Sequence, residues 1–330
     1  MSEKLLTVSV AGYNVERFIR ECLDSCLISD MNALEVIVVD DGGSDATLEI
    51  AQEYADRYPG VFRPVHKENG GYGTTVNTSL SLAQGKYFRP LDGDDWFDAD
   101  GLAALLRATE SNADVLIFPY VRELGVESRV MDQAAEECSG LMPFEEAQIP
   151  WRLGMHAVAY RTELLRDSGL ELPGRMLYTD VLYAVKPLSL VKTAWVGHSP
   201  VYRYRLGVEG QSVSVDTLLK HREERIRIID MLAQIRSELP SGCDLAEHIL
   251  SAWIVDYATW HIQMLFRQQP TDEYWDEIVY LRSLLEREGL SEVARSASKS
   301  YGLLSHAGRR SYPAISWLYR RFKGNKYYSV

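Results

Sequence analysis

Residues 34–45, LEVIVVDDGGSD, decide the fold class of this chain. An apolar run from Leu34 to Val39 ends in consecutive acidic and glycine residues, and residues 46–58 then follow a helical pattern with Asp45 as the expected N-cap. Continuous rather than alternating hydrophobicity predicts a strand that is buried on both faces. Such strands occur in parallel sheets flanked by helices, so this stretch predicts an α/β protein.

The same order of strand, loop and helix recurs on both sides of this stretch. Before it, a β-branched run at residues 4–10 leads through Gly12 and Asn14 into an expected helix at residues 16–27. Further strands are expected at residues 61–65, 86–91, 115–121, 192–196 and 200–204, and further helices at residues 74–83 and 102–111. We therefore expect an α/β domain over residues 1–215.

The hydrophobic pattern changes from about residue 216. Apolar residues recur there at three- and four-residue spacing, which predicts long helices at residues 217–239, 244–267 and 273–287. We expect residues 216–330 to form a helical C-terminal domain that ends in a basic aromatic tail.

The composition is that of a globular protein and excludes disordered and fibrous classes. The 330 residues are 46% hydrophobic and 25% charged, with a formal net charge of -12. An acidic chain of this kind predicts no nucleic-acid partner. Four scattered cysteines do not make a disulfide framework, and we interpret Cys22 and Cys26 as buried core residues rather than as half of a zinc site. Without a signal peptide or a long apolar run, we expect a cytoplasmic protein.

The charge is distributed unevenly along the chain. Residues 295–330 contain eight Lys and Arg and no acidic residue, while residues 1–294 contain the other 27 basic and all 47 acidic residues, for a net charge of -20. Within residues 311–326 these cations alternate with aromatic side chains, a composition that suits an anionic membrane surface. The alternative is a basic last helix that docks on the acidic body of the protein.

Acidic residues follow two of the expected strands. Asp40 and Asp41 come directly after one strand, and Asp92, Asp94 and Asp95 come after another. The carboxyl ends of parallel strands meet at one edge of a sheet, where α/β proteins bind their ligands. Either group alone is equally well explained as a turn. Together the carboxylates would repel one another unless a cation neutralised them, and oxygen ligands suit Mg²⁺ or Mn²⁺.

Four ordered motifs resemble the signatures of the family 2 glycosyltransferases, which have a GT-A fold. They are SVAGYN at residues 9–14, VVDDGGSD at residues 38–45, ENGG at residues 68–71 and LDGDD at residues 91–95. Beyond them, YTD at residues 178–180 is similar to the motif that carries the family's base. YRYR at residues 202–205, followed by QSVS at residues 211–214, is similar to the end of the catalytic domain in members that assemble bacterial capsular polysaccharides or exopolysaccharides.

The resemblance implies roles for individual residues of a GT-A catalytic domain over residues 1–215. Asn14, Asp40 and Asp41 would line the nucleoside pocket, and Lys67, Asn69 and Gly70 would also bind the donor. Asp92 would contact the ribose or the metal ion, and Asp94 would hold the metal on the diphosphate. Asp180 would be the general base, with a helix N-cap as the alternative for this residue.

The sequence departs from the family pattern at four places. Ala11-Gly12 stands where a proline usually precedes the Tyr-Asn pair. Gly43 replaces the serine that usually follows Asp-Gly, and Val76 stands where an arginine often precedes Asn77. The missing arginine removes a diphosphate contact that Lys67, Arg203 or Arg205 would have to supply. Thr179 replaces the common acidic residue, so Asp180 is the only carboxylate in its motif.

The function implied by the resemblance is transfer of a sugar from a nucleotide diphosphate donor, most simply a UDP-sugar, with inversion of configuration. The acceptor would be a hydroxyl of a saccharide or lipid-linked saccharide in cell-surface polysaccharide synthesis, at the inner face of the membrane, with Mg²⁺ or Mn²⁺ as cofactor. One alternative is a sugar-nucleotide-forming nucleotidyltransferase, but the N-terminal region has no glycine-rich loop with Arg or Lys. Another is a non-catalytic carbohydrate-binding scaffold, against which the retained aspartates argue.

Two further residues have alternative interpretations. Trp96 directly follows the acidic loop and would either stack on an acceptor sugar or belong to the core. His156 has no metal-ligand spacing to another histidine, so we expect a structural role for it, although its segment could approach the acceptor.

Overall fold

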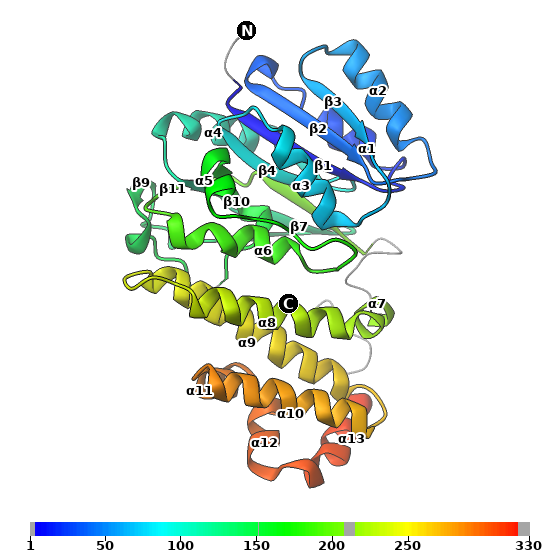
Figure 1. Cartoon of the computed structure of the whole chain (residues 1–330), viewed down its shortest axis with the longest axis vertical. Coiled ribbons are helices and arrows are strands. Elements are labelled where there is room, and N and C mark those ends of the chain that lie inside the picture. Colours follow the sequence, from blue (N-terminus) through cyan, green and yellow to red (C-terminus); the bar gives the residue numbers. More distant parts are fainter. Residues whose placement is uncertain (1–3, 151, 208–214, 323–330) are drawn as a thin grey trace. The chain divides into compact units, whose positions relative to one another are not determined.

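The computed structural model describes residues 4–150, 152–207 and 215–322 (Figure 1). The chain divides into two compact units, residues 1–209 with 240–246, and residues 210–239 with 247–330. The last expected motif, residues 211–214, and the end of the basic tail, residues 323–330, lie outside the described residues. The boundary that we expected after residue 215 stays a prediction.

An eight-stranded sheet forms the centre of the first unit. Its described strands follow the order β3 (Phe62–His66), β2 (Leu34–Asp40), β1 (Leu6–Gly12), β4 (Tyr87–Asp92), β10 (Val158–Arg161), β6 (Val115–Ile117), β11 (Thr193–Val196) and β9 (Gly140–Pro143). The first four strands are parallel, and every residue of β2 is buried, as the continuous apolar run predicts.

Two strands of this sheet break the parallel arrangement of the first four. β10 runs antiparallel to both β4 and β6, and β9 runs antiparallel to β11. Antiparallel neighbours need no helical crossover between them. Strand direction here depends on pairing between distant segments, which the hydrophobic pattern does not encode.

A second sheet of four described strands lies in the same unit. It has the order β5 (Trp96–Phe97), β12 (Tyr202–Leu206), β7 (Tyr120–Leu124) and β8 (Glu127–Met131). The single strand expected at residues 115–121 is therefore two strands in two sheets. Pro119 separates β6 from β7, and proline has no N–H to donate to a ladder.

Helices follow most of the parallel strands. In the first unit they are α1 (Ile19–Asp24), α2 (Thr47–Arg57), α3 (Tyr72–Leu82), α4 (Ala99–Ala108), α5 (Thr162–Asp167) and α6 (Asp180–Val185). Cys22 and Cys26 are fully buried, which confirms their expected place in the core. Ala46 rather than Asp45 is the N-cap of α2, but the Asp45 Oδ1 atom accepts a hydrogen bond from the Thr47 N–H at 3.0 Å.

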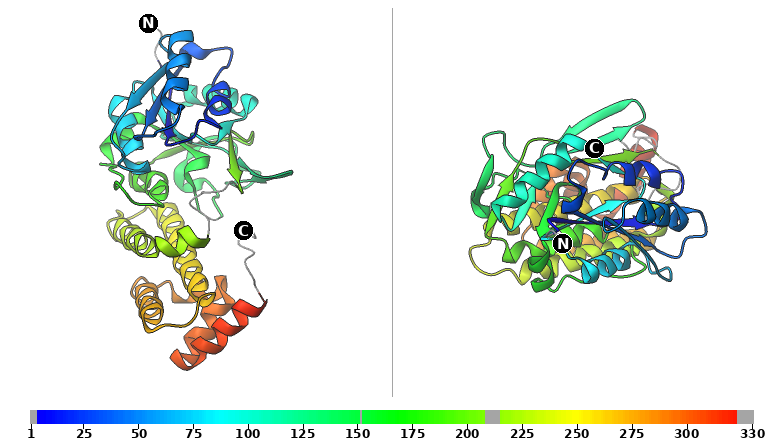
Figure 2. Two further views of the ribbon diagram at one scale, coloured as in Figure 1. Left: turned by 90° about the vertical axis from the view of Figure 1, so that its right-hand side faces the viewer. Right: turned by 90° about the horizontal axis from the view of Figure 1, so that it is seen from above.

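The second unit is helical, as expected. Figure 2 shows its helices following one another along the chain from yellow-green to red. They are α7 (Val215–Lys220), α8 (Arg222–Ser237), α9 (Asp244–Phe266), α10 (Asp272–Arg287), α11 (Ser291–Ala297), α12 (Lys299–Ala307) and α13 (Tyr312–Phe322). The helix expected at residues 217–239 is interrupted at His221, whose φ of -106° and ψ of 26° are not helical. Among the described residues, no helix combines the length and apolarity that crossing a bilayer requires.

The packing of α4 gives a direct test of the first unit. A Cβ atom at Gly101 would lie 1.9 Å from the Pro200 carbonyl oxygen, whereas at the helical Gly302 the nearest such atom is 3.8 Å away. We expect Gly101→Ala to lower the free energy of unfolding by about 1–3 kcal/mol through overpacking. Gly302→Ala should be neutral or stabilising by up to about 1 kcal/mol. Urea unfolding followed by circular dichroism measures both, and equal stabilities would contradict this packing.

Candidate functional site

The acidic ends of β2 and β4 lie at the same edge of the sheet. Strand β1 runs between them and pairs Gly12 with Asp40 on one side and Ala11 with Asp92 on the other. The expectation that the two acidic groups share one edge is thus confirmed by the strand register.

The carboxylates of Asp40 and Asp41 bind groups of the surrounding loops. Asp40 accepts a hydrogen bond from the Gly43 N–H at 3.1 Å and pairs with His66 Nδ1 at 2.6 Å. Asp41 Oδ1 accepts hydrogen bonds from Lys67 Nζ at 2.5 Å and from the Gly70 N–H at 2.9 Å. Its Oδ2 atom accepts one from the Gly71 N–H at 2.7 Å. Asp41 therefore holds in place residues 67–71, the glycine loop that precedes α3.

The neighbouring polar residues surround these two aspartates. Asn14 has a positive φ of 54°, and its Oδ1 atom accepts a hydrogen bond from the Ser44 N–H at 2.8 Å. Asn69 is exposed in the loop before α3. A Cβ atom at Gly43 would lie 2.7 Å from Asp40 Oδ1, which explains why glycine replaces the usual serine there.

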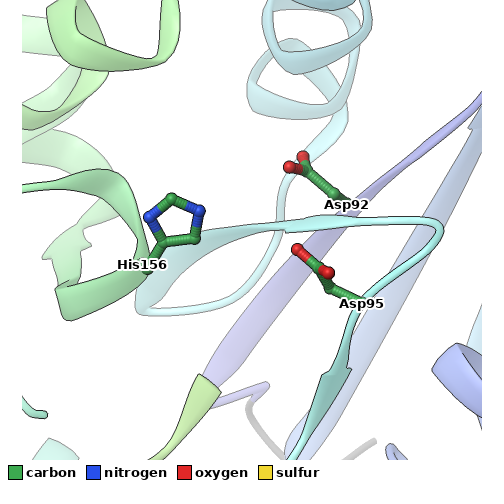
Figure 3. A group of neighbouring side chains, drawn as sticks. All are labelled: Asp92, Asp95 and His156. Atoms are coloured by element: carbon green, nitrogen blue, oxygen red, sulfur yellow. The ribbon is translucent and has the colours of Figure 1, made fainter. Parts of the chain in front are cut away.

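Asp92, Asp95 and His156 form a compact group at the end of β4 (Figure 3). One potential ligand atom from each residue lies within 4.8 Å of the others. The Asp92 Oδ1 atom is buried and has no hydrogen-bond partner in the part of the chain that the structure describes. Both Asp95 oxygens are occupied, Oδ1 by the Arg205 N–H at 2.7 Å and Oδ2 by the Tyr202 hydroxyl at 2.6 Å. Asp92 is thus the carboxylate of this group that offers a free oxygen.

Burial and mutual repulsion raise the free-energy cost of ionising the carboxyl groups of this site. Burial, followed by the charges of Asp94 and Asp180, raises the pKa of Asp92 well above its usual value. Burial, Asp92 and Asp94 raise the pKa of Asp95 in the same direction. Burial raises the pKa of Asp180 to about 6. The four carboxylates therefore interact electrostatically, and a bound cation would reduce the repulsion between them.

The residues of this group fit a divalent cation. Burial, together with Arg122 and Arg89, lowers the pKa of His156 to about 3, so its imidazole is neutral at pH 7 and able to bind a metal. A neutral imidazole beside an unpartnered carboxylate oxygen suits Mn²⁺, and carboxylates suit Mg²⁺. The fold places the His156 ring in the acidic centre, and the structural role that we expected for this residue stays a prediction.

The predicted metal ligand Asp94 and base Asp180 lie near this group without being among its three members. Asp94 acts on the pKa of both Asp92 and Asp95, and its carbonyl oxygen accepts a hydrogen bond from Arg205 Nε at 2.8 Å. Asp180 is the first residue of α6, and Thr179 holds the N-cap position. Metal binding by Asp94 and base catalysis by Asp180 remain predictions.

The three predicted cations have different surroundings. Lys67 also donates to Thr74 Oγ1 at 2.8 Å, within the glycine loop. The Arg203 guanidinium is held by Asp98 and Glu123, each at 2.7 Å. Arg205 reaches the acidic loop, and its guanidinium lies 4.4 Å from the centre of the Trp96 ring. One face of Trp96 is therefore covered by Arg205.

Sequence reasoning missed two residues that support this site, Tyr202 and Arg89. The Tyr202 hydroxyl donates to Asp95 and accepts from the Asp92 N–H at 3.1 Å. Arg89 is fully buried, donates from Nη2 to the His156 carbonyl, and lies 5.7 Å from the centre of the Tyr202 ring. Its Nε and Nη1 atoms have no hydrogen-bond partner among the described residues. The YRYR motif drew attention to Tyr202, but no local signal marks Arg89.

Comparison with known proteins agrees with this geometry. The model of "Glycosyl transferase family 2" matches residues 7–166, which include both acidic strand ends. These residues therefore resemble a family 2 glycosyltransferase domain. The putative glycosyltransferase EpsH of Bacillus subtilis is 35% identical over 132 residues, 40% of this chain and 38% of that protein. TarS of Staphylococcus aureus, a poly(ribitol-phosphate) β-N-acetylglucosaminyltransferase, is 28% identical over 213 residues, 63% of this chain and 36% of that protein. The aligned regions thus span less than two fifths of either relative.

Solved structures of similar fold match nearly the whole chain. The crystal structure of S. aureus TarS 1–349 matches with a TM-score of 0.73 at 20% identity, covering 96% of this chain and 91% of that one. The mannosyltransferase PcManGT from Pyrobaculum calidifontis matches with a TM-score of 0.53 at 18% identity, covering 98% of this chain and 89% of that one. The expected GT-A fold with a C-terminal helical region is therefore confirmed.

The buried guanidinium of Arg89 generates a prediction about positioning. Arg89→Met should lower the free energy of unfolding by about 1–3 kcal/mol, because it leaves the His156 carbonyl without this donor. It should weaken Mn²⁺ binding about tenfold or more, because a buried hydrogen bond from a charged group contributes roughly 1.5–3 kcal/mol. Mn²⁺ calorimetry and thermal unfolding measure the two effects. Arg89→Lys, which keeps a charge, should retain more affinity, and unchanged binding in Arg89→Met would refute the positioning role.

Proposed function

We propose that this protein transfers a sugar from a nucleotide diphosphate donor to an acceptor hydroxyl with inversion of configuration. The observation that carries this proposal is the buried Asp92 oxygen without a partner, which lies in a field of carboxylates that includes Asp180. A metal-dependent transferase needs a cation site beside a base, and this edge of a family 2 domain offers both.

The donor in this proposal is a UDP-sugar. TarS has been solved with UDP-GlcNAc and PcManGT with GDP-Man and Mn²⁺, which supports a nucleotide-sugar donor with a divalent ion. Asn14, Asp40 and Asp41 would surround the nucleoside, and the loop with Lys67, Asn69 and Gly70 would continue the pocket. Arg205 is the predicted diphosphate contact that already reaches the acidic loop.

Asp92, Asp94 and His156 would hold the Mg²⁺ or Mn²⁺ ion, with Asp95 fixed behind them by Tyr202. The ion, when bound, acts as a Lewis acid for the negative charge of the leaving diphosphate. In the reaction the acceptor oxygen forms a bond to the anomeric carbon while the bond to the diphosphate oxygen breaks and its electron pair stays on the diphosphate. The proton of the acceptor hydroxyl passes to Asp180.

Asp180 is suited to this proton transfer by its environment. Burial raises its pKa to about 6, which leaves it ionised at pH 7 and more basic than an exposed aspartate. A general base works best when its pKa lies near the working pH. Thr179, the residue in place of the family's usual acidic one, is 1% exposed and adds no second carboxylate.

The acceptor in this proposal is a saccharide or lipid-linked saccharide of a bacterial surface polysaccharide. The similarity to EpsH, a putative glycosyltransferase, and to TarS, a poly(ribitol-phosphate) β-N-acetylglucosaminyltransferase, supports this class. The proposed location is the cytoplasm at the inner face of the membrane. A nucleotidyltransferase or a non-catalytic scaffold would not transfer a sugar to an acceptor hydroxyl. Acceptor-dependent turnover therefore separates the proposed function from these alternatives.

Metal-dependent nucleotide binding is the first test. UDP should bind at least about tenfold more tightly with Mn²⁺ than without it, because the ion neutralises the diphosphate among several carboxylates. Asp92→Asn should remove this enhancement, while Asp100→Asn, at an exposed position in α4, should not. Isothermal titration measures all three proteins. UDP binding that ignores Mn²⁺ in the wild type would eliminate the proposed mechanism.

Replacement of the base gives the second test. Asp180→Asn should reduce kcat for transfer by roughly 10²–10⁴ and leave UDP affinity nearly unchanged, because the base acts on the acceptor. The exposed Asp167 provides a matched Asp167→Asn control in the same unit. In the wild type, kcat should rise with pH through about 6, since Asp180 must be deprotonated to accept the proton. Full activity of Asp180→Asn in a donor screen would exclude its role as the base.

A further inference from the structure

The last described helix, α13, has two different faces. Tyr312, Ile315 and Ser316 are buried, at 3%, 7% and 0% exposure. On the opposite side of the same helix, Pro313, Ala314, Trp317, Leu318 and Arg321 are exposed. We call these five exposed residues the outer face of α13.

The inner side of α13 is already packed within the helical unit. The centre of the Tyr312 ring lies 6.0 Å from the centre of the Phe266 ring and 5.6 Å from that of the Trp275 ring. The centre of the Tyr319 ring lies 5.4 Å from the centre of the Phe266 ring, and the Tyr319 hydroxyl donates a hydrogen bond to Ser300 Oγ at 2.5 Å. These contacts anchor α13 through its inner side.

The outer face combines exposed apolar side chains with cations. Trp317 and Leu318 are 54% and 46% exposed, which is high for large apolar residues. Arg321 lies on the same face, and the exposed Arg310 lies just before the helix. The sequence contains no acidic residue from residue 295 to its end, so no negative charge of this segment opposes an anionic partner.

We propose that the outer face of α13 docks on the surface of an anionic phospholipid bilayer. Tryptophan prefers the headgroup region, where its ring is partly buried and its N–H remains hydrated. Arginine extends its charge toward lipid phosphates while its stem stays in the apolar layer. A helix with an apolar and cationic face lies in the plane of such an interface, and α13, with 11 residues, is too short to span it.

This inference divides the aromatic residues of the tail by function. Tyr312 and Tyr319 hold α13 on the helical unit, and Trp317 and Leu318 would enter the membrane interface. Arg309 is outside the proposed surface because it pairs with Asp272. The inference does not depend on the transferase proposal, because vesicle binding needs neither donor, metal nor acceptor.

Vesicle sedimentation of the full chain tests the proposal. The wild type should pellet with phosphatidylcholine vesicles that contain 30% phosphatidylglycerol and far less with phosphatidylcholine alone, and 0.5 M NaCl should reduce the bound fraction. Arg310→Glu/Arg321→Glu should weaken binding about tenfold or more, because each cation near the surface contributes roughly 1 kcal/mol. Trp317→Ala/Leu318→Ala should weaken it at both salt concentrations.

A matched control separates the outer face from overall charge. Arg227→Glu/Arg287→Glu makes the same charge change at exposed positions on α8 and α10 and should bind vesicles within about twofold of the wild type, since distant exposed charges are screened. Equal binding to neutral and anionic vesicles, or equal losses in the control and the Arg310/Arg321 variant, would overturn the proposal. Sedimentation velocity adds a further outcome: wild-type oligomers that Trp317→Ala/Leu318→Ala dissociates would make the face a self-association surface instead. The charge variant and the salt dependence keep the test decisive if the apolar variant fails to fold.

Discussion

The concentration of carboxylates at the end of β4 is the constraint on which the rest of the first unit depends. Asp92, Asp95 and Asp180 are each shifted toward the protonated state by burial, and Asp92 and Asp95 also by neighbouring aspartates. Like charges in a poorly solvated place are stable only when fixed groups or a cation compensate them. The Tyr202 hydroxyl, which donates to Asp95, and the Arg205 N–H, which donates to the same carboxylate, serve this requirement.

Different aspartates of this sheet edge hold the surrounding loops and offer oxygens to a ligand. Asp41 and Asp95 use their oxygens on backbone N–H groups and on the side chains of Lys67 and Tyr202. Asp92 keeps one oxygen without a partner in the same edge of the sheet. Carboxylates that look equivalent in the sequence therefore differ in what they can bind, because their hydrogen-bond partners come from distant segments.

The uneven distribution of charge along the chain also reflects where the charged side chains lie in the structure. Part of the negative charge of the first 294 residues lies at the strand ends, where it suits a cation and, through it, a diphosphate. Among the described cations of the last segment, Arg320 and Arg321 lie on α13, whose inner side packs through aromatic contacts within its own unit. An acidic protein is thus compatible with phosphate ligands, provided that each is bound locally.

The sequence by itself determined the strands and helices of the parallel half of the sheet and the meeting of Asp40 and Asp92 at one edge, because these follow from local hydrophobic runs and their order. It also identified the family through motifs that are short and contiguous. Only the tertiary structure decided the antiparallel direction of β10 and the entry of His156 into the acidic centre. Each depends on pairing between segments far apart in the chain, for which no local pattern exists. Arg89 is the clearest case, because a buried arginine has meaning only through the Tyr202 ring and the His156 carbonyl that tertiary packing brings to it.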